Sequence, residues 1–163
     1  MRKAAFLIAM FAVCACANAD VTRHPLPGGS TFPIAQAVEV TAGTTMVYHS
    51  GTLPGPANPD ADPTSRSFYG DTETQANSVF ERMEASLENL GLGFEDVVKM
   101  TVFLVGDPQM PGGRMDFAGF MKSYSKYFGT ADQPNKPARS AFQIAALARP
   151  GVFIEVEVIL ARP

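Results

Sequence analysis

Two segments of the chain carry apolar residues at the three- and four-residue spacing of an amphipathic helix. The first runs from Ala76 to Leu90 and is followed by Gly91, a residue typical of the position after a helix. Thr72–Gln75 (TETQ) has the form of a capping box at its start. The second helix is predicted from about Asp116 to Gly129. Its apolar side consists of Phe117, Met121, Tyr124 and Phe128.

Five other segments have the β-branched or alternating pattern of strands, at 37–40, 45–50, 98–105, 139–146 and 152–161. Short turns separate the first two and the last two of them, so each of these pairs predicts a hairpin. The Pro- and Gly-containing segment 20–31 predicts an irregular lead-in. Segment 53–70 holds four prolines and predicts a long loop, a type of segment that often forms a functional lid.

The order β-β-α-β-α-β-β predicts an α+β fold in which both helices cover one face of a sheet. In the last strand, one set of alternating residues suits the helix side. The other set, Phe153, Glu155, Glu157 and Ile159, is partly apolar as well, and no third layer remains in the chain. We therefore expect the chain to self-associate through the uncovered sheet face.

The N-terminus has the features of a signal peptide. Arg2 and Lys3 precede the apolar run Ala4–Ala17, which is too short to span a bilayer as a helix, and Ala17-Asn18-Ala19 supplies small residues for cleavage. We predict a signal peptide at 1–19 and a single domain at 20–163, exported to the periplasm and not membrane-bound after cleavage. A buried helix, or a lipid anchor at Cys16, is the weaker alternative.

The composition of the chain argues against several classes of protein. The chain is 46% apolar and 18% charged, which excludes a disordered protein. It has 13 basic and 16 acidic residues and no basic stripe, so we expect no nucleic-acid partner. Cys14 and Cys16 both lie in the predicted signal peptide, and no Cys/His cluster has metal-ligand spacing. The phosphate-loop, Rossmann, Gly-x-Ser-x-Gly and His-Glu-x-x-His motifs are absent from the sequence.

The last two predicted strands hold the most informative polar residues. A hairpin closing around 147–151 would project Arg139, Gln143, Glu155 and Glu157 from one face of the sheet. An arginine fork can bind a small carboxylate through two parallel hydrogen bonds, and a nearby glutamate can hold and deprotonate water. The same residues are also typical of a structural ion pair at a subunit seam.

These residues lie in a segment that resembles a known family. Pro137-Ala138-Arg139-Ser140 and the later strand Ile154–Glu157 resemble the C-terminal signature of the Rid family of reactive intermediate deaminases, also called YjgF-like or liver perchloric-acid-soluble protein-like. The resemblance covers roughly residues 33–161. It also includes Pro33–Ala37, the His49-Ser50-Gly51 turn, Val98–Phe103 and the helix from Asp116.

The resemblance implies a chorismate mutase-like fold and a homotrimer with three clefts between subunits. It implies hydrolysis of 2-imino or 2-enamino acids to 2-oxo acids and ammonia, with no metal or organic cofactor. By position, Arg139 would bind the substrate carboxylate and Glu155 would position the attacking water. Ser50 and Gly51 would line the cleft.

Three cleft positions depart from the family pattern. Ile34 stands where a tyrosine is usual, Ala141 where a cysteine is common, and Met121 where a polar residue is common. We therefore expect a more apolar cleft, and an alternative function as a non-catalytic trimer that binds small carboxylates. An endoribonuclease activity, attached to some relatives, is disfavoured by the acidic charge. Export points to an imine made outside the cytoplasm.

Overall fold

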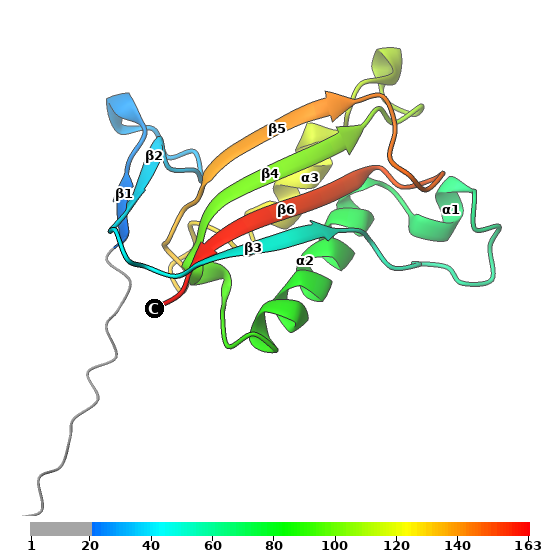
Figure 1. Cartoon of the computed structure of the whole chain (residues 1–163). Helices are drawn as coiled ribbons and strands as arrows, with labels where there is room; N and C mark the ends of the chain where they lie inside the picture. Colours follow the sequence, from blue (N-terminus) through cyan, green and yellow to red (C-terminus); the bar gives the residue numbers. More distant parts are fainter. Residues whose placement is uncertain (1–20) are drawn as a thin grey trace, which may run out of the picture.

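The computed structural model describes residues 21–163 (Figure 1). The predicted signal peptide and the alternative anchor at Cys16 lie outside the described residues. Six strands and three α-helices follow one another along the chain, with three short 3-10 turns between them. The elements are β1 (Val21–His24), β2 (Ala37–Val40), β3 (Met46–Thr52), α1 (Arg66–Tyr69), α2 (Thr72–Glu88), β4 (Val97–Val105), α3 (Phe117–Tyr124), β5 (Ala138–Ile144) and β6 (Ile154–Ala161).

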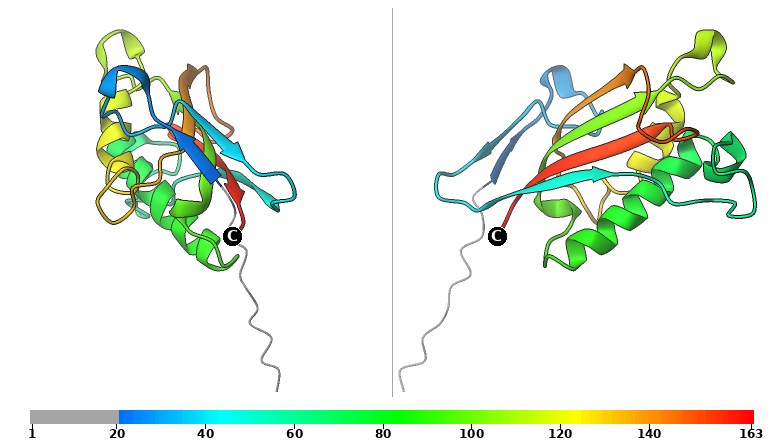
Figure 2. Two further views of the ribbon diagram at one scale, coloured as in Figure 1. Left: turned by 90° about the vertical axis from the view of Figure 1, so that its left-hand side faces the viewer. Right: turned by 45° about the vertical axis from the view of Figure 1, so that its right-hand side comes forward.

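The main sheet has four strands in the order β3-β6-β4-β5. Strands β4 and β5 are parallel, because α3 carries the chain back between them, and β6 is antiparallel to both β4 and β3. Helices α2 and α3 lie together on one face of this sheet, and no helix of the described chain covers the other (Figure 2). The predicted α+β class with both helices on one face is confirmed.

Both predicted hairpins are wrong. Strand β2 pairs with β1, with His24 opposite Ala37, and β3 pairs with β6 instead. Strands β5 and β6 do not touch, because β4 lies between them. A strand that follows a helical crossover pairs with the strand before the helix, so β5 takes the outer position beside β4. Strand β1 also lies in the segment predicted to be irregular.

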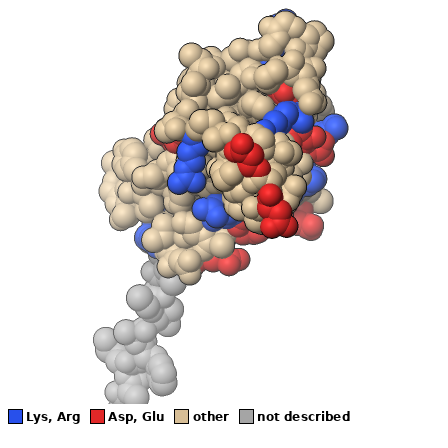
Figure 3. Space-filling view, turned by 90° about the vertical axis from the view of Figure 1, so that its right-hand side faces the viewer, with Lys and Arg blue, Asp and Glu red and all other residues tan. Residues whose placement is uncertain are grey.

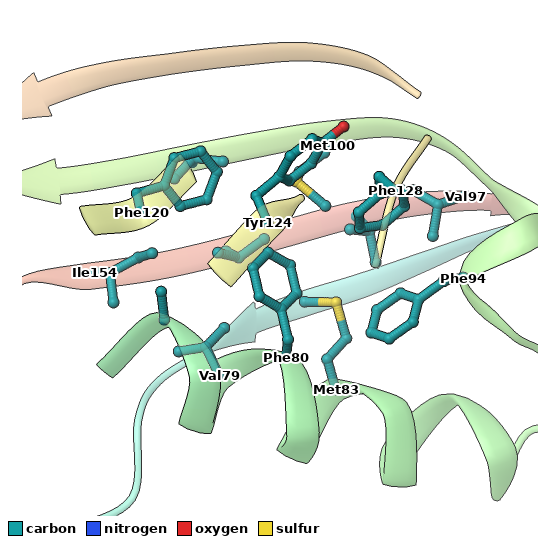
Figure 4. Close-up of a cluster of buried hydrophobic side chains, with 14 of the residues drawn as sticks. Val79, Phe80, Met83, Phe94, Val97, Met100, Phe120, Tyr124, Phe128 and Ile154 are labelled. Carbon is teal, nitrogen blue, oxygen red and sulfur yellow. The ribbon is translucent and has the colours of Figure 1, made fainter. Parts of the chain in front are cut away.

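The core lies between the helices and the sheet. Alternate residues of β4 and β6, including Met100, Val102, Ile154 and Val156, are fully buried against the helices. Phe80 of α2 lies at the centre of an aromatic cluster with Phe94, Phe120, Tyr124, Tyr127 and Phe128 (Figure 4). Each such side chain contributes roughly 1.5–3 kcal/mol when it is fully buried.

The helix ends show how the chain positions its polar groups. Helix α2 begins one residue earlier than the predicted capping box, since the Asp71 side chain accepts the hydrogen bond of the Thr74 N–H at 2.9 Å. Gln75 is therefore not a capping residue and turns into the core. Gly91 adopts a positive φ of 65° that ends the helix, and the following Leu92 N–H bonds to the Leu87 carbonyl.

The long loop 53–70 folds against the body of the protein and contains α1. Arg66 in α1 donates to Asp107 at 2.8 Å, and Asp107 is almost completely buried. Burial alone would raise the pKa of Asp107, but hydrogen bonds from Arg66 and from the Gln109 N–H outweigh it and hold the pKa below its usual value. The loop is thus fixed to the segment that follows β4.

The sheet face opposite the helices carries exposed aromatic groups. Tyr48 is 76% exposed and Phe142 is 43% exposed. Phe142 packs edge-on against Phe103, and Lys99 donates to the Ser140 hydroxyl beside them. Residues 21–163 contain no helix long and apolar enough to cross a membrane.

Candidate active site

Arg139 lies near the start of β5 and extends toward the helices. Its guanidinium carbon is 4.1 Å from the centre of the Tyr124 ring and 5.1 Å from that of Phe120, both in α3. Phe117, at 5.8 Å, and Phe32, at 5.5 Å, complete an aromatic enclosure. Such rings attract a cation through their negative faces and hold its plane in place. We call these five residues the guanidinium half of the candidate site.

This arginine has unused hydrogen-bonding capacity. Its Nη1 atom is buried and has no hydrogen-bond partner among residues 21–163. Burial lowers the pKa of Arg139, and burial raises the pKa of Tyr124, so the ring beneath the cation stays a neutral phenol. The Tyr124 hydroxyl donates to the Pro33 carbonyl at 2.7 Å, and its oxygen points away from Phe80 (Figure 4). A buried donor without an acceptor indicates a place for a ligand oxygen.

Three of the predicted cleft residues belong to the same region. Ile34, Met121 and Ala141 are half-buried and pack against the core. The segment containing Ile34 is held beside β5, because the Ala35 N–H bonds to the Pro137 carbonyl at 2.9 Å. Ala141 follows Arg139 by two residues and therefore projects from the same side of the strand. Three apolar side chains therefore stand at the positions that depart from the family pattern, and the more apolar cleft stays a prediction.

Ser50, Gly51 and Glu155 form a second group, the carboxylate half. Strand β3 contains an extra residue between His49 and Thr52 relative to β6, which places Ser50 and Gly51 in an irregular, exposed stretch. The Glu155 carboxylate lies against the Cα of Gly51, so that a Cβ there would collide with it. Only glycine leaves room for this approach.

The segment before Glu155 is fixed by a buried glutamine. Gln75 accepts from the Phe153 N–H at 2.7 Å and donates to the carbonyls of Gly151 and Gly70. The Arg66 guanidinium lies 5.8 Å from the centre of the Phe153 ring. Backbone hydrogen bonds and a cation over the ring therefore hold the start of β6, which in turn positions the Glu155 side chain.

One protomer does not bring the two halves together. Arg139 pairs with Met100 and Glu155 with Phe103 on opposite sides of β4. Arg139 contacts α3, whereas Glu155 lies between the buried residues Ile154 and Val156 and so projects from the uncovered face. The expectation that Arg139, Gln143, Glu155 and Glu157 share one face is wrong, because it depended on the β5–β6 hairpin.

The Gln143 side chain forms hydrogen bonds with the backbone of the segment before α3. Its side-chain oxygen accepts from the Met115 N–H at 2.9 Å, and its amide donates to the Gly113 carbonyl. Within residues 21–163, no group of three or more His, Cys, Asp or Glu side chains could hold a metal ion.

Sequence reasoning missed the aromatic enclosure and the glutamine. Phe117 and Tyr124 are seven residues apart on the apolar side of one predicted helix, but nothing in that spacing indicates that they face an arginine 15 residues or more downstream. Phe32 directly follows the predicted lead-in 20–31 and belongs to no predicted element. Gln75 fitted the capping pattern, and its burial depends on the carbonyls of distant Gly151.

Comparison with known proteins agrees with this architecture. The family described as Endoribonuclease L-PSP matches residues 29–162. The protein DfrA from Myxococcus xanthus is 37% identical over 128 residues, covering 78% of this chain and 83% of the relative. A RutC family protein from Pyrococcus abyssi is 34% identical over 138 residues, covering 84% and 90%. The putative reactive intermediate deaminase TdcF from Escherichia coli K12 is 30% identical over 134 residues, covering 82% and 90%.

Solved structures show the same fold. A protein of unknown function of the Rid family, YyfB from Yersinia pestis, matches with a TM-score of 0.63 at 21% identity, covering 86% of this chain and 98% of that one. The structure of E. coli TdcF with bound serine matches with a TM-score of 0.55 at 30% identity, covering 80% and 93%. The chain therefore belongs to the Endoribonuclease L-PSP family, which is the Rid (YjgF) family whose signature its last strands resemble.

Proposed function

We propose that this protein is a hydrolytic deaminase of 2-imino and 2-enamino acids, acting at sites shared between protomers of a homotrimer. The observation that carries the proposal is the buried Nη1 of Arg139. This atom has no hydrogen-bond partner within residues 21–163, and its guanidinium group lies against the Tyr124 ring of the aromatic enclosure. A carboxylate is the anion that best matches a planar guanidinium, and it would satisfy this donor. The relationship to TdcF, a putative reactive intermediate deaminase, supports the same substrate class.

The arrangement of the halves supports a shared site. Strands β5 and β3 are the two edges of the sheet, and the halves face opposite sides of it. Arg139 and Glu155 can serve one ligand only if the guanidinium half of one protomer meets the carboxylate half of the next. Contacts between two different surfaces form a ring when the rotation that relates successive protomers closes. The family resemblance implies that this ring has three members.

The chemistry requires two groups from the protein. Arg139 of one protomer would bind the carboxylate of the imino acid and hold its C2 carbon in the cleft. Glu155 of the neighbouring protomer would accept a proton from a water molecule whose oxygen adds to C2, which forms a carbinolamine. When the substrate is a protonated imine, Glu155 would then return this proton to the amine of the carbinolamine. As the C–N bond breaks, Glu155 would take the hydroxyl proton, so that the C=O bond of the 2-oxo acid forms, and that proton would leave with ammonia as ammonium.

The exposed backbone beside Glu155 has a supporting role in this scheme. Ser50 and Gly51 would line the cleft where the attacking water and the imine nitrogen meet, and the missing Cβ of Gly51 leaves the carboxylate access to them. Ile34, Met121 and Ala141 would make the surroundings of Arg139, and so of the bound carboxylate of the substrate, apolar.

The proposal is tested by following the loss of a freshly generated 2-iminobutanoate in stopped-flow experiments. The wild-type protein should accelerate hydrolysis well above the buffer rate, and Glu155→Gln should lower kcat by roughly 100-fold or more with little change in the affinity for 2-oxobutanoate. Binding of 2-oxobutanoate without any acceleration would select the non-catalytic alternative. Cleavage of RNA without imine hydrolysis would contradict the proposal.

The proposal also includes export of the protein to the periplasm. The first 19 residues would direct the chain to the periplasm and be removed before Asp20, which would leave a mature protein free of cysteine. Its substrate would then be an imine formed outside the cytoplasm. The intact mass of the protein recovered from the periplasm should correspond to a chain that starts at Asp20, and a mass that includes a lipid or residues 1–19 would contradict this part.

A further inference from the structure

A surface hollow of about 330 Å³ lies beside the carboxylate half. It is formed by the end of β3, the following residues 52–54, helix α2, and the loop between β5 and β6. Gly51 belongs both to its wall and to the contact with Glu155. The hollow therefore opens next to the group that would hold the attacking water.

The lining of the hollow is positively charged. Arg82 of α2 and Arg149 of the β5–β6 loop both line it, and no acidic residue does. Neither arginine side chain forms an ion pair or a hydrogen bond with another part of residues 21–163, although acidic residues outnumber basic ones in the whole chain. On the face of the molecule that Figure 3 shows, exposed basic side chains lie among acidic ones and uncharged surface.

Two other polar side chains of the wall, His49 and Ser86, are already hydrogen-bonded to each other. The His49 Nδ1 lies 2.9 Å from the Ser50 carbonyl, to which it donates, and its Nε2 lies 2.9 Å from the Ser86 hydroxyl. With Nδ1 as the donor, Nε2 accepts the hydrogen bond of the serine O–H. The two arginines are thus the groups of the hollow that are free to bind an anion.

We propose that this hollow binds a second carboxylate of the substrate, so that the preferred substrates are 2-imino dicarboxylic acids. The inference rests on the proposed function. With the first carboxylate on Arg139 of the neighbouring protomer and C2 beside Glu155, a side chain that passes Gly51 enters the hollow. Its terminal carboxylate would lie between two arginines, where charge-assisted hydrogen bonds are strongest. A volume of about 330 Å³ accepts a short acidic side chain.

The test compares two imines of similar length, 2-iminoglutarate and 2-iminopentanoate, each generated by oxidising the amino acid. For the wild-type protein we expect a kcat/KM on 2-iminoglutarate that is about 10- to 100-fold higher. The double variant Arg82→Gln/Arg149→Gln should lose this preference and keep its rate on 2-iminopentanoate. Lys126→Gln removes an exposed positive charge outside the hollow, and it should retain both rates.

Three results would overturn the inference in different ways. Equal rates on both imines in the wild-type protein would contradict the second carboxylate site and leave the proposed function intact. A preference that survives in the double variant would place the second carboxylate elsewhere. Hydrolysis of neither imine would remove the proposed function and, with it, this inference.

Calorimetric titration distinguishes the substrate carboxylate from a free phosphate. Glutarate should bind the wild-type protein and lose at least tenfold in affinity in the double variant, whereas butanoate should not depend on the two arginines. If inorganic phosphate binds in the hollow and glutarate does not, the site takes a phosphate group, and the dicarboxylic substrate is contradicted.

Discussion

The guanidinium half and the carboxylate half are built in different ways. Arg139 is enclosed by side chains of α3 and Phe32, and the full burial of Phe120 and Tyr124 in the core fixes its position. Glu155 lies on the uncovered face beside exposed backbone of an edge strand. Its position depends on hydrogen bonds that hold the segment before β6. The position of Arg139 is therefore set by the packing of aromatic side chains, whereas the position of Glu155 is set by hydrogen bonds to the backbone that precedes it.

The difference predicts how each half responds to mutation. A substitution of Arg139 in the guanidinium half should remove substrate binding and leave the fold intact, since this arginine is a desolvated cation that contributes little to stability. A substitution of Gln75, which anchors the segment before Glu155 in the carboxylate half, should lower both the stability of the fold and the turnover of the substrate. The four predictions below test this contrast.

Arg139→Ala should have the largest effect. We expect kcat/KM for 2-iminobutanoate to fall by roughly 1000-fold or more, because the substrate carboxylate loses its partner. Arg139→Lys keeps the charge but not the fork, and it should recover only part of the activity. The melting temperature of the alanine variant should equal or exceed that of the wild type. Activity within threefold of wild type in Arg139→Ala would contradict the role assigned to the guanidinium half.

Gln75→Met should destabilise the protein by about 2–4 kcal/mol, because the Phe153 N–H and two glycine carbonyls lose their partner. Urea unfolding measures this change. Turnover should fall as well, since Glu155 follows the released segment. The matched control is Gln109→Met, an exposed side chain, for which we expect less than about 0.5 kcal/mol. Equal stability losses in the two variants would contradict the anchoring role.

Gly51→Ala should lower kcat by about tenfold, because the new Cβ displaces the Glu155 carboxylate. The same change in a Glu155→Ala background should cause no further loss, since the colliding group is gone. Additive losses in this double-mutant cycle would show that Gly51 acts through something other than Glu155.

The smallest effect concerns acid stability. Because the pKa of Asp107 is lowered in the folded protein, its contribution to stability is complete above about pH 4, the value of a free aspartate. That contribution is lost as the pH falls through the lower folded pKa. The difference in unfolding free energy between wild type and Asp107→Asn should be constant from pH 7 to 5 and narrow below pH 4. A difference that widens in acid would reverse the assigned sign.

The same contrast explains what the sequence could predict. Local periodicity identified α2, α3, β4 and β6, because each buries one face within a single continuous segment. The pairing of strands was predicted wrongly, because neighbours in sequence were taken as neighbours in space. The unit β4–α3–β5 is a strand-helix-strand sequence, which favours parallel pairing, and that signal would have corrected the second hairpin.

For the site, sequence reasoning found Arg139 and Glu155 as chemically unusual residues in apolar strands. The sequence did not indicate that Arg139 and Glu155 face opposite sides of the sheet. Which residues of two strands share a face depends on how the strands pair, and β5 and β6 were wrongly expected to pair with each other. The aromatic enclosure and Gln75 depend on contacts across 15 to 107 positions of the chain, such as Phe32 with Arg139, which no local pattern encodes.

Mixing two inactive variants tests the central claim most directly. The Arg139→Ala and Glu155→Gln proteins are each purified, then dissociated and reassembled together, and the hydrolysis of 2-iminobutanoate is measured. If each site takes its arginine from one protomer and its glutamate from the next, the mixture should recover roughly a quarter of the wild-type rate, since each site then draws both halves at random. A mixture that forms hybrid trimers but stays as inactive as its two components would contradict a site shared between protomers.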